Sequence, residues 1–304
     1  MPSPRRQSLT PASMPTALYG VAGWPLEQTL SPLLHNTGFQ ALGLPAVYLR
    51  WAIPPEGLAS FADSMRLLDI QGASITIPHK IALMPLLDSV SEQARLAGAV
   101  NTVHRDGRKL CGENTDVTGF LCPLAEFDAE NTDVLLLGAG GAARAAAAGL
   151  ALRRFRRVFV ATPSDRSHMP LAEHFGCIPL AWKNRHDIQA DLVINSTPLG
   201  MRGKQMDETP FDFEKIVRPR GNRTLTAYDM VYNPLETRFL REARLAGWDC
   251  VSGLSMFLGQ GAAQFRIWTG QKLPIQADEA VKAELRAREK IPAECPASRV
   301  ENTG

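Results

Sequence analysis

The stretch DVLLLGAGGAA at residues 133–143 decides the fold of the second half of this chain. A short apolar run leads directly into a glycine-rich turn, and an alanine-rich segment continues to about Leu152. The spacing is G-x-G-x-x-A, in which a strand, a tight turn and a helix N-terminus together hold the pyrophosphate of a dinucleotide. The stretch therefore predicts a Rossmann-type unit whose cofactor lies against Gly138, Ala139, Gly140, Gly141 and Ala142.

Strand-like and helix-like segments alternate on both sides of this turn. Downstream, strands are expected at 157–161, 191–195, 225–230 and 249–251, with a helix at 236–245. Upstream, strands are expected at 17–22, 47–53, 73–77 and 99–103, and helices are expected to begin near residues 31, 56, 78 and 91. Such alternation predicts an α/β fold.

Two helices near the C-terminus, at 253–270 and 279–290, do not continue this alternation, and we expect them to pack back on the first domain. The chain length also favours two domains. The prediction is an α/β substrate-binding domain at 17–117 and 253–290, and a doubly wound nucleotide-binding domain at 118–252. Flexible tails are expected at 1–16 and 291–304.

The composition is that of an ordinary globular protein, with 304 residues, of which 45% are hydrophobic and 21% charged. The net charge of +2 gives no reason to expect nucleic acid or an anionic membrane as a partner. The five cysteines form no CxxC pair, and the six histidines show no zinc-ligand spacing. We therefore expect a cytoplasmic protein without a metal. The expected functional form is a monomer or a homodimer, with a small molecule as its partner.

The segment after the expected strand at 157–161 bears on the choice of cofactor. An acidic residue directly at this strand end would bind the ribose 2′-hydroxyl of NAD. Thr162, Ser164 and Arg166 follow instead, and two hydroxyls with a guanidinium can hold the 2′-phosphate of NADP. Because Asp165 lies among them, NADP is the prediction and NAD remains the alternative. The arginines of 153–157 fall at the far end of the preceding helix and are not assigned to the cofactor.

Three polar residues of the first half fit either a structural role or ligand binding. Ser31 precedes Pro32, which marks a helix start with serine at N-cap and proline at N1. Thr29 and Ser31 therefore either cap this helix or offer an anion a site at its positive end. Asn101, inside the strand expected at 99–103, either bonds neighbouring backbone or contacts a hydroxylated ligand.

Lys80 and Asp116 have the same two interpretations. Pro78 suits the first position of a helix, so Lys80 is expected in the first turn, where a cation opposes the helix dipole. Lys80 is therefore either a solvated surface residue or a functional one. Asp116 precedes another helix and is either its N-cap or a functional carboxylate.

Taken together and in order, these segments resemble the shikimate dehydrogenase family over nearly the whole chain, from about Leu18 to about Pro274. The resemblance rests on several separated motifs that agree in order. They are Gly23–Pro25 with Thr29–Pro32 and His35-Asn36, Thr76–Lys80, Gly98–Thr102, Asn114–Asp116, Gly138–Ala142, Asn195–Met201, Asp229–Pro234 and Gly253–Trp268.

The resemblance implies reversible hydride transfer between NADPH and the 3-keto group of 3-dehydroshikimate, which gives shikimate on the pathway to chorismate and the aromatic amino acids. Lys80 would be the catalytic acid and base, and Asp116 its partner. Thr29 and Ser31 would bind the substrate carboxylate. The ring hydroxyls or their neighbours would be contacted by Thr76, Asn101, Tyr232 and Gln260. Further cofactor contacts are implied at Glu92, Thr197, Met230 and Gly253.

The chain departs from the family pattern at several positions. Thr29 stands where serine is usual, Gln28 where histidine is usual, and Val117 replaces a glycine. Ser74 replaces an asparagine, which removes an amide that the family has near the substrate carboxylate. Pro163 and the shifted Arg166 alter the segment that the family uses for NADP. An NAD-preferring quinate/shikimate dehydrogenase is therefore an alternative. A ligand-sensing pseudoenzyme is a second one, which the presence of both Lys80 and Asp116 disfavours.

Overall fold

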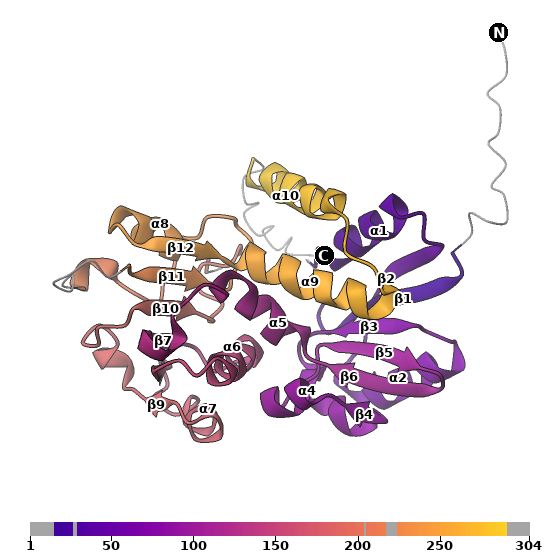
Figure 1. Cartoon of the computed structure of the whole chain (residues 1–304), viewed down its shortest axis with the longest axis horizontal. Helices are drawn as coiled ribbons and strands as arrows, with labels where there is room; N and C mark the ends of the chain where they lie inside the picture. The colour runs from indigo at the N-terminus through magenta and orange to yellow at the C-terminus, as the bar shows by residue number, and fades with distance from the viewer. Residues whose placement is uncertain (1–14, 27–28, 204, 217–223, 291–304) are drawn as a thin grey trace, which may run out of the picture.

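The computed structural model describes residues 15–26, 29–203, 205–216 and 224–290. Gln28 and almost all of the two expected tails lie outside the described residues. Two six-stranded sheets lie side by side with helices around them, and one long helix runs from one sheet to the other (Figure 1). The predicted α/β architecture is confirmed.

The first sheet has the strand order β2-β1-β3-β5-β6-β4. Its strand β1 is parallel to both neighbours, β2 and β3, whereas β5 is antiparallel to both β3 and β6. The strands are β1 Ala17–Gly23, β2 Ala46–Ala52, β3 Gly72–Ile75, β4 Ser89–Val90, β5 Thr102–Asp106 and β6 Lys109–Glu113. The accompanying helices are α1 Ser31–Ala41, α2 Leu58–Leu67, α3 His79–Ala82 and α4 Glu92–Ala97.

The second sheet is parallel throughout, with the order β12-β11-β10-β7-β8-β9. Its order reverses between β7 and β10, so the crevice for a ligand is expected beyond the carboxyl ends of these two strands. The elements are β7 Asp133–Leu137, α6 Gly141–Leu152, β8 Arg157–Ala161, α7 Met169–Phe175, β9 Ile178–Pro179, β10 Leu192–Asn195, β11 Thr226–Asp229, α8 Arg238–Leu245 and β12 Asp249–Ser252.

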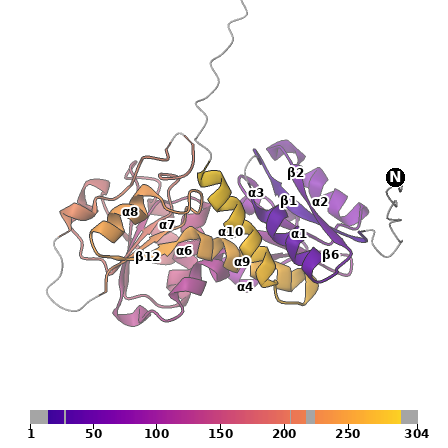
Figure 2. The same cartoon turned by 90° about the horizontal axis from the view of Figure 1, so that it is seen from above.

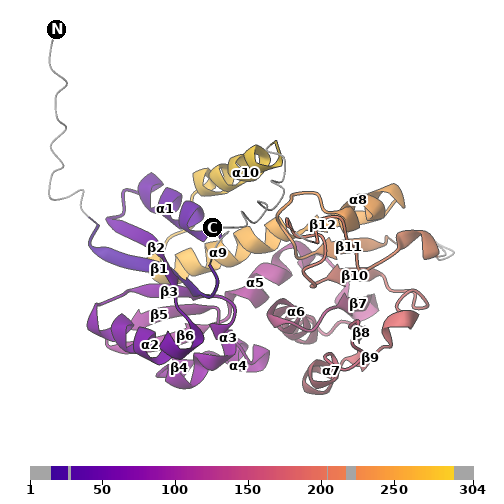
Figure 3. The same ribbon diagram turned by 180° about the vertical axis from the view of Figure 1, so that it is seen from behind.

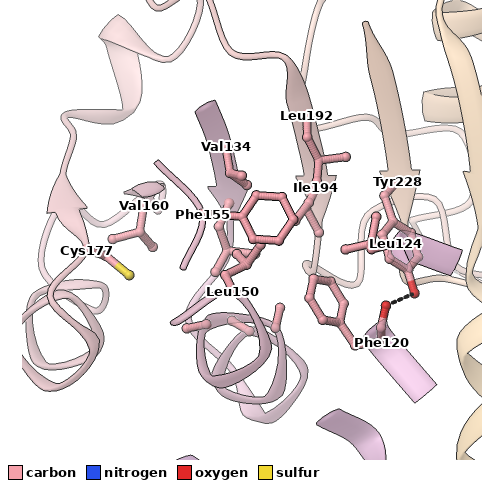
Figure 4. Close-up of a cluster of buried hydrophobic side chains, with 14 of the residues drawn as sticks. Phe120, Leu124, Val134, Leu150, Phe155, Val160, Cys177, Leu192, Ile194 and Tyr228 are labelled. Atoms are coloured by element: carbon pink, nitrogen blue, oxygen red, sulfur yellow. Dashed lines mark hydrogen bonds between the residues drawn. The ribbon is translucent and has the colours of Figure 1, made fainter. Parts of the chain in front are cut away.

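A buried apolar cluster holds α6 against this sheet (Figure 4). Val134 and Ile194 from neighbouring strands pack with Leu150 of α6. Phe120 stacks on Tyr228 with ring centroids 5.4 Å apart, and the Tyr228 hydroxyl donates to the Phe120 carbonyl at 3.5 Å. Phe120 belongs to α5 Thr115–Leu121, so the cluster also fixes α5, the segment that connects the two sheets.

The last two helices return to the first sheet. α9 Gly253–Thr269 starts at the end of β12 and contacts α5 and α1, and α10 Ile275–Glu289 packs against α1 (Figures 1 and 2). Leu34 of α1 and Phe257 of α9 form one cluster with Val281 of α10. The expected return of these helices to the first part of the chain is therefore confirmed.

Several helix starts differ from the sequence predictions. Ser31 is the first residue of α1 rather than its N-cap, because Leu30 occupies the cap position. Asn114, not Asp116, caps α5, since its side chain accepts from the Val117 amide. Pro78 precedes α3 instead of opening it.

Other segment boundaries also differ. The last helix begins at Ile275 rather than at residue 279. The helix expected to begin near residue 78 ends at Ala82, and a 3₁₀ turn over Met84–Leu86 follows, where Pro85 lacks an amide donor. The strand expected at 99–103 begins only at Thr102. The Val100 amide is bonded outside the ladder, to the Lys80 carbonyl at 2.8 Å.

The arginines after α6 stabilise the far edge of the second sheet. Arg156 and Arg157 both bond the carboxylate of Asp133, at the starts of β8 and β7. The glycine turn leaves the opposite end of β7. This arrangement agrees with the expectation that these arginines do not serve the cofactor.

Candidate active site

A cavity of about 370 Å³ lies between the two sheets. Its walls come from the ends of β1 and β3, from α3, α5 and α9, and from the segment after β11. Figure 3 shows α3, α5, α6 and α9 converging where the two halves of the chain meet. All eight residues predicted to contact substrate line this cavity: Thr29, Ser31, Thr76, Lys80, Asn101, Asp116, Tyr232 and Gln260.

Lys80 and Asp116 form an ion pair on the cavity wall. The Lys80 ammonium donates to Oδ2 of Asp116 at 2.5 Å. Their side chains are 19% and 12% exposed, so both are largely screened from water and still open to a ligand. Asp116 lies in the first turn of α5, where the helix dipole favours a carboxylate. The pair therefore presents a proton donor at a fixed place.

Thr29 and Ser31 lie together where α1 begins. The Thr29 hydroxyl accepts from the Ser31 amide at 3.2 Å and donates to the Ser31 hydroxyl at 3.1 Å. The first turn of α1 contains no acidic residue. Two hydroxyls at the positive end of an uncompensated helix dipole are suited to a carboxylate.

Asn101 is buried in a second group of polar side chains. Its Oδ1 accepts from the Thr115 amide at 2.7 Å and from the Thr102 hydroxyl at 2.9 Å. Its Nδ2 donates to the Thr115 hydroxyl at 3.0 Å. One N–H of this amide is thereby used, and the second remains for the cavity that Asn101 lines.

A third polar group underlies the cavity floor, with Gln264 of α9 at its centre. Oε1 of Gln264 accepts from the Ser74 hydroxyl at 2.9 Å and lies 3.3 Å from Nε2 of His35. The Tyr48 hydroxyl donates to Ser74 at 2.5 Å. Burial lowers the pKa of His35 to about 3, against the opposing effect of its bond to Gln264, so this ring is neutral.

The glycine turn opens beside Lys80. Gly138 has a φ of +117°, and a Cβ there would meet Ser196 Oγ at 2.5 Å, so only glycine fits. A Cβ on Gly140 would meet nothing within 4 Å, and one on Gly141 would lie 3.9 Å from Cδ of Lys80. α6 has neither a side-chain cap nor an acidic residue in its first turn. Its N-terminus is therefore available to an anionic group next to the ion pair.

The other predicted cofactor residues follow the carboxyl ends of the parallel strands. Ala142, Met230 and Gly253 line the cavity itself. Thr197 follows β10, and both its amide and its hydroxyl donate to Oδ1 of Asn195. Glu92 is exposed at the start of α4 and does not line the cavity.

A cluster of hydroxyls follows β8. Ser164 and Ser167 lie 2.8 Å apart between their Oγ atoms, and the Ser167 hydroxyl donates to Thr162 at 3.0 Å. Asp165 accepts from the Trp182 amide at 2.6 Å, so its carboxylate already has a partner. Arg166 is exposed beside these hydroxyls.

Asp229 joins the two loops on the cofactor side of the cavity. It accepts from Asn195 Nδ2 at 3.0 Å, from the Val231 amide at 3.0 Å and from the Thr237 hydroxyl at 2.5 Å. Burial raises its pKa to about 7, although all three donors favour the ionised form. Asp229 thereby holds the segment that carries Met230 and Tyr232 into the cavity.

The sequence prediction missed the residues behind the cavity wall. Tyr48 and Gln264 were given no role of their own. His35 was named only within a family motif, and Ser74 only as a departure from the family pattern. One signal was available, because Gln264 follows Gln260 by four positions and therefore lies on the same face of α9. The contacts of Tyr48 and His35 depend on tertiary packing.

Comparison with known proteins identifies the family. A model of the shikimate dehydrogenase substrate binding domain matches residues 21–103, and a model of the shikimate 5′-dehydrogenase C-terminal domain matches residues 253–281. A curated shikimate dehydrogenase (NADP(+)) of Pelobacter propionicus is 48% identical over 281 residues, which cover 92% of this chain and 100% of the relative. The chain belongs to the shikimate dehydrogenase family.

Solved structures of shikimate dehydrogenases share the whole fold. One in complex with NADP+ has a TM-score of 0.81 at 33% identity, covering 89% of this chain and 96% of that chain. One from Thermus thermophilus in complex with shikimate has a TM-score of 0.78 at 35% identity, covering 89% of this chain and 100% of that chain. The family resemblance and the two-domain fold predicted from the sequence are confirmed.

No helix among the described residues has the length and apolar character needed to cross a membrane.

Proposed function

We propose that this protein catalyses the reversible, NADPH-dependent reduction of 3-dehydroshikimate to shikimate. The observation that carries the proposal is the Lys80–Asp116 ion pair, at 2.5 Å, in a cavity beside the glycine turn of a dinucleotide-binding sheet. A proton donor and a hydride-carrying cofactor at one cavity match the reduction of a ketone. The curated relative named for shikimate and NADP(+) supports this substrate and this cofactor.

The residues at the carboxyl edge of the second sheet fit NADP. The open space at Gly140 and the uncapped N-terminus of α6 suit a pyrophosphate. Thr162, Ser164 and Arg166 would hold the 2′-phosphate, and the carboxylate of Asp165 beside them accepts from the Trp182 amide at 2.6 Å. Thr197, Met230 and Gly253 would complete the binding surface. When bound there, NADPH supplies the hydride.

The chain's own residues hold the substrate and move the proton. Thr29 and Ser31 would bind its carboxylate, while Thr76, Asn101, Tyr232 and Gln260 would orient the ring. As the substrate carbonyl oxygen gains negative charge, Nζ of Lys80 stabilises that charge and donates a proton to it. In the reverse direction, neutral Lys80 takes the hydroxyl proton. Asp116 orients Lys80 in both directions.

We further propose that residues 17–117 and 253–290 form the substrate-binding domain and residues 118–252 the nucleotide-binding domain. The sheet memberships and the packing of α10 on α1 support these boundaries. Four cysteines among the described residues are free, namely Cys111, Cys122, Cys177 and Cys250, which supports a reducing, cytoplasmic compartment. The proposed functional form is a monomer or a homodimer. Nucleic acid is not proposed as a partner.

Initial rates of cofactor reduction test the proposal. The protein is mixed with shikimate or quinate, and with NADP⁺ or NAD⁺, and the absorbance of the reduced cofactor is followed. We expect shikimate with NADP⁺ to give the highest kcat/KM of the four combinations. Higher kcat/KM with quinate and NAD⁺ would replace the proposal by the alternative enzyme, and no reduction with any pair would refute both.

A further inference from the structure

The buried amide of Gln264 controls the hydrogen-bonding character of the cavity wall. We propose that Gln264 fixes the proton of the Ser74 hydroxyl, so that Ser74 offers the substrate only an acceptor and recognises one of its ring hydroxyls. The proposal rests on the proposed function, because it names how that substrate is selected. Both residues line the cavity, and their exposed fractions are only 1% and 6%.

A backbone carbonyl decides the orientation of the Gln264 amide. Nε2 of Gln264 lies 3.3 Å from the carbonyl oxygen of Asn101 and 3.0 Å from the Thr102 hydroxyl. A carbonyl oxygen can only accept, so the nitrogen of Gln264 must face Asn101. The opposite orientation would place two acceptor oxygens against each other. Oε1 of Gln264 therefore points to Ser74 and His35.

A backbone amide decides the neighbouring orientation independently. The Thr115 amide can only donate, and it lies 2.7 Å from Oδ1 of Asn101. Oδ1 of Asn101 therefore also receives the Thr102 hydroxyl proton, at 2.9 Å. Because Thr102 donates to Asn101, it accepts from Gln264, which agrees with the orientation set by the Asn101 carbonyl.

These orientations determine where the hydroxyl protons of Ser74 and Tyr48 lie. Oε1 of Gln264 can only accept, so the Ser74 hydroxyl donates to it at 2.9 Å. The proton in the 2.5 Å contact between Ser74 and Tyr48 must then come from Tyr48. Ser74 has thus given its proton and accepted another, and a single lone pair remains for the cavity.

The remaining lone pair selects the group that can lie against it. A ligand hydroxyl can donate to Ser74, whereas a carboxylate there would face an acceptor and be disfavoured. The part of the cavity suited to the carboxylate is the start of α1, where Thr29 and Ser31 lie at the positive end of the helix. Ser74 is therefore suited to a ring hydroxyl of the substrate rather than to its carboxylate.

The test combines one substitution with substrates that lack one group. kcat/KM with NADP⁺ is measured for the wild type and Ser74→Ala, using shikimate, its 4-deoxy and 5-deoxy analogues, and its carboxamide. We expect Ser74→Ala to lower kcat/KM for shikimate by roughly 3- to 10-fold, as for loss of one neutral hydrogen bond. The loss should disappear with one of the two deoxy analogues and persist with the carboxamide. Ser60→Ala, on the exposed surface of α2, is the matched control and should change nothing.

A loss of the same size with both deoxy analogues would overturn the proposal, and so would a loss that disappears only with the carboxamide. Gln264→Met is a second test, because it removes the acceptor that holds the Ser74 proton. In this variant the ratio of kcat/KM for shikimate to kcat/KM for the deoxy analogue should move toward unity. Thermal unfolding shows whether this variant folds, and if it does not, Ser74→Ala alone decides. Wild-type turnover of shikimate reports on the proposed function separately.

Discussion

The ammonium of Lys80 and the carboxylate of Asp116 lie 2.5 Å apart, although 36 positions separate them in the chain. Each belongs to a short helix that is anchored by its neighbours. The Lys80 carbonyl accepts from the Val100 amide at 2.8 Å, and Asn114 caps the helix that carries Asp116. The pair is therefore positioned by the fold, which makes Asp116 the group that aims the Lys80 ammonium.

Asp116→Asn tests this orienting role. The amide keeps the shape of the carboxylate and one acceptor oxygen but removes the charge that holds Lys80. We expect kcat for shikimate oxidation to fall by up to about 100-fold, because misplacing a catalytic group has effects of this order. Steady-state kinetics measures the change. Unchanged kcat would mean that Asp116 is not needed to orient Lys80, and Asp106→Asn, at the exposed end of β5, serves as the control.

Arg166→Ala tests the proposed 2′-phosphate contact. Removing a partly screened charge-assisted hydrogen bond should raise KM for NADP⁺ by about 5- to 20-fold. KM for NAD⁺, which lacks the 2′-phosphate, should stay unchanged, as should both values in the exposed control Arg108→Ala. An equal rise for both cofactors would show that Arg166 acts on something other than the 2′-phosphate.

Asp229→Asn tests the effect of burying a carboxylate. The pKa of Asp229 is about 7 in the folded protein, above its usual value of 3.8, so folding favours the protonated form. This contribution to stability is complete below about pH 4 and is lost as the pH rises to about 7.

An asparagine at this position cannot ionise, and its Oδ1 can still accept from Asn195 and Val231 while its Nδ2 donates to Thr237. Between pH 4 and pH 7 the wild type should therefore lose up to about 4 kcal/mol of unfolding free energy that the Asp229→Asn variant keeps. Urea denaturation at several pH values measures the difference. A difference that stays constant, or that shrinks as the pH rises, would contradict the assignment.

Leu34→Ala tests the packing of the C-terminal helices on the first sheet. Leu34 is fully buried between α1, α9 and α10, and a cavity there should lower the unfolding free energy by about 2–5 kcal/mol. Leu67→Ala, at a residue that is 84% exposed on α2, should change the stability by less than about 0.5 kcal/mol. Equal effects of the two substitutions would contradict the described packing of Leu34.

The parts of the fold that local patterns determine were predicted well. The strand, glycine turn and helix around Gly138 follow from apolar periodicity and backbone geometry, which act between residues close together in the chain. The return of the C-terminal helices followed from a break in the alternation, and Leu34, Phe257 and Val281 confirm it. The start of α1 was misplaced by one residue, because serine before proline signals a helix start without saying which residue caps it.

The buried polar network could not be predicted, because its bonds join residues far apart in the chain. Gln264 contacts Ser74 and Asn101, which precede it by 190 and 163 positions. No periodicity or spacing predicts which buried amide meets which hydroxyl. Asp229 was recognised only as part of a motif, since its three partners come from a strand end, a loop and a helix start.

The most direct test of the proposed chemistry compares turnover and binding in Lys80→Ala. Absorbance of NADPH gives kcat with shikimate, and calorimetry gives the shikimate Kd of the same variant. We expect kcat to fall by about 10²- to 10⁴-fold, because general acid–base catalysis is lost, while Kd changes only a few-fold. Lys109→Ala, at the exposed start of β6, should match the wild type in both. A kcat of Lys80→Ala close to that of the wild type would contradict the assignment of the proton transfer to Lys80.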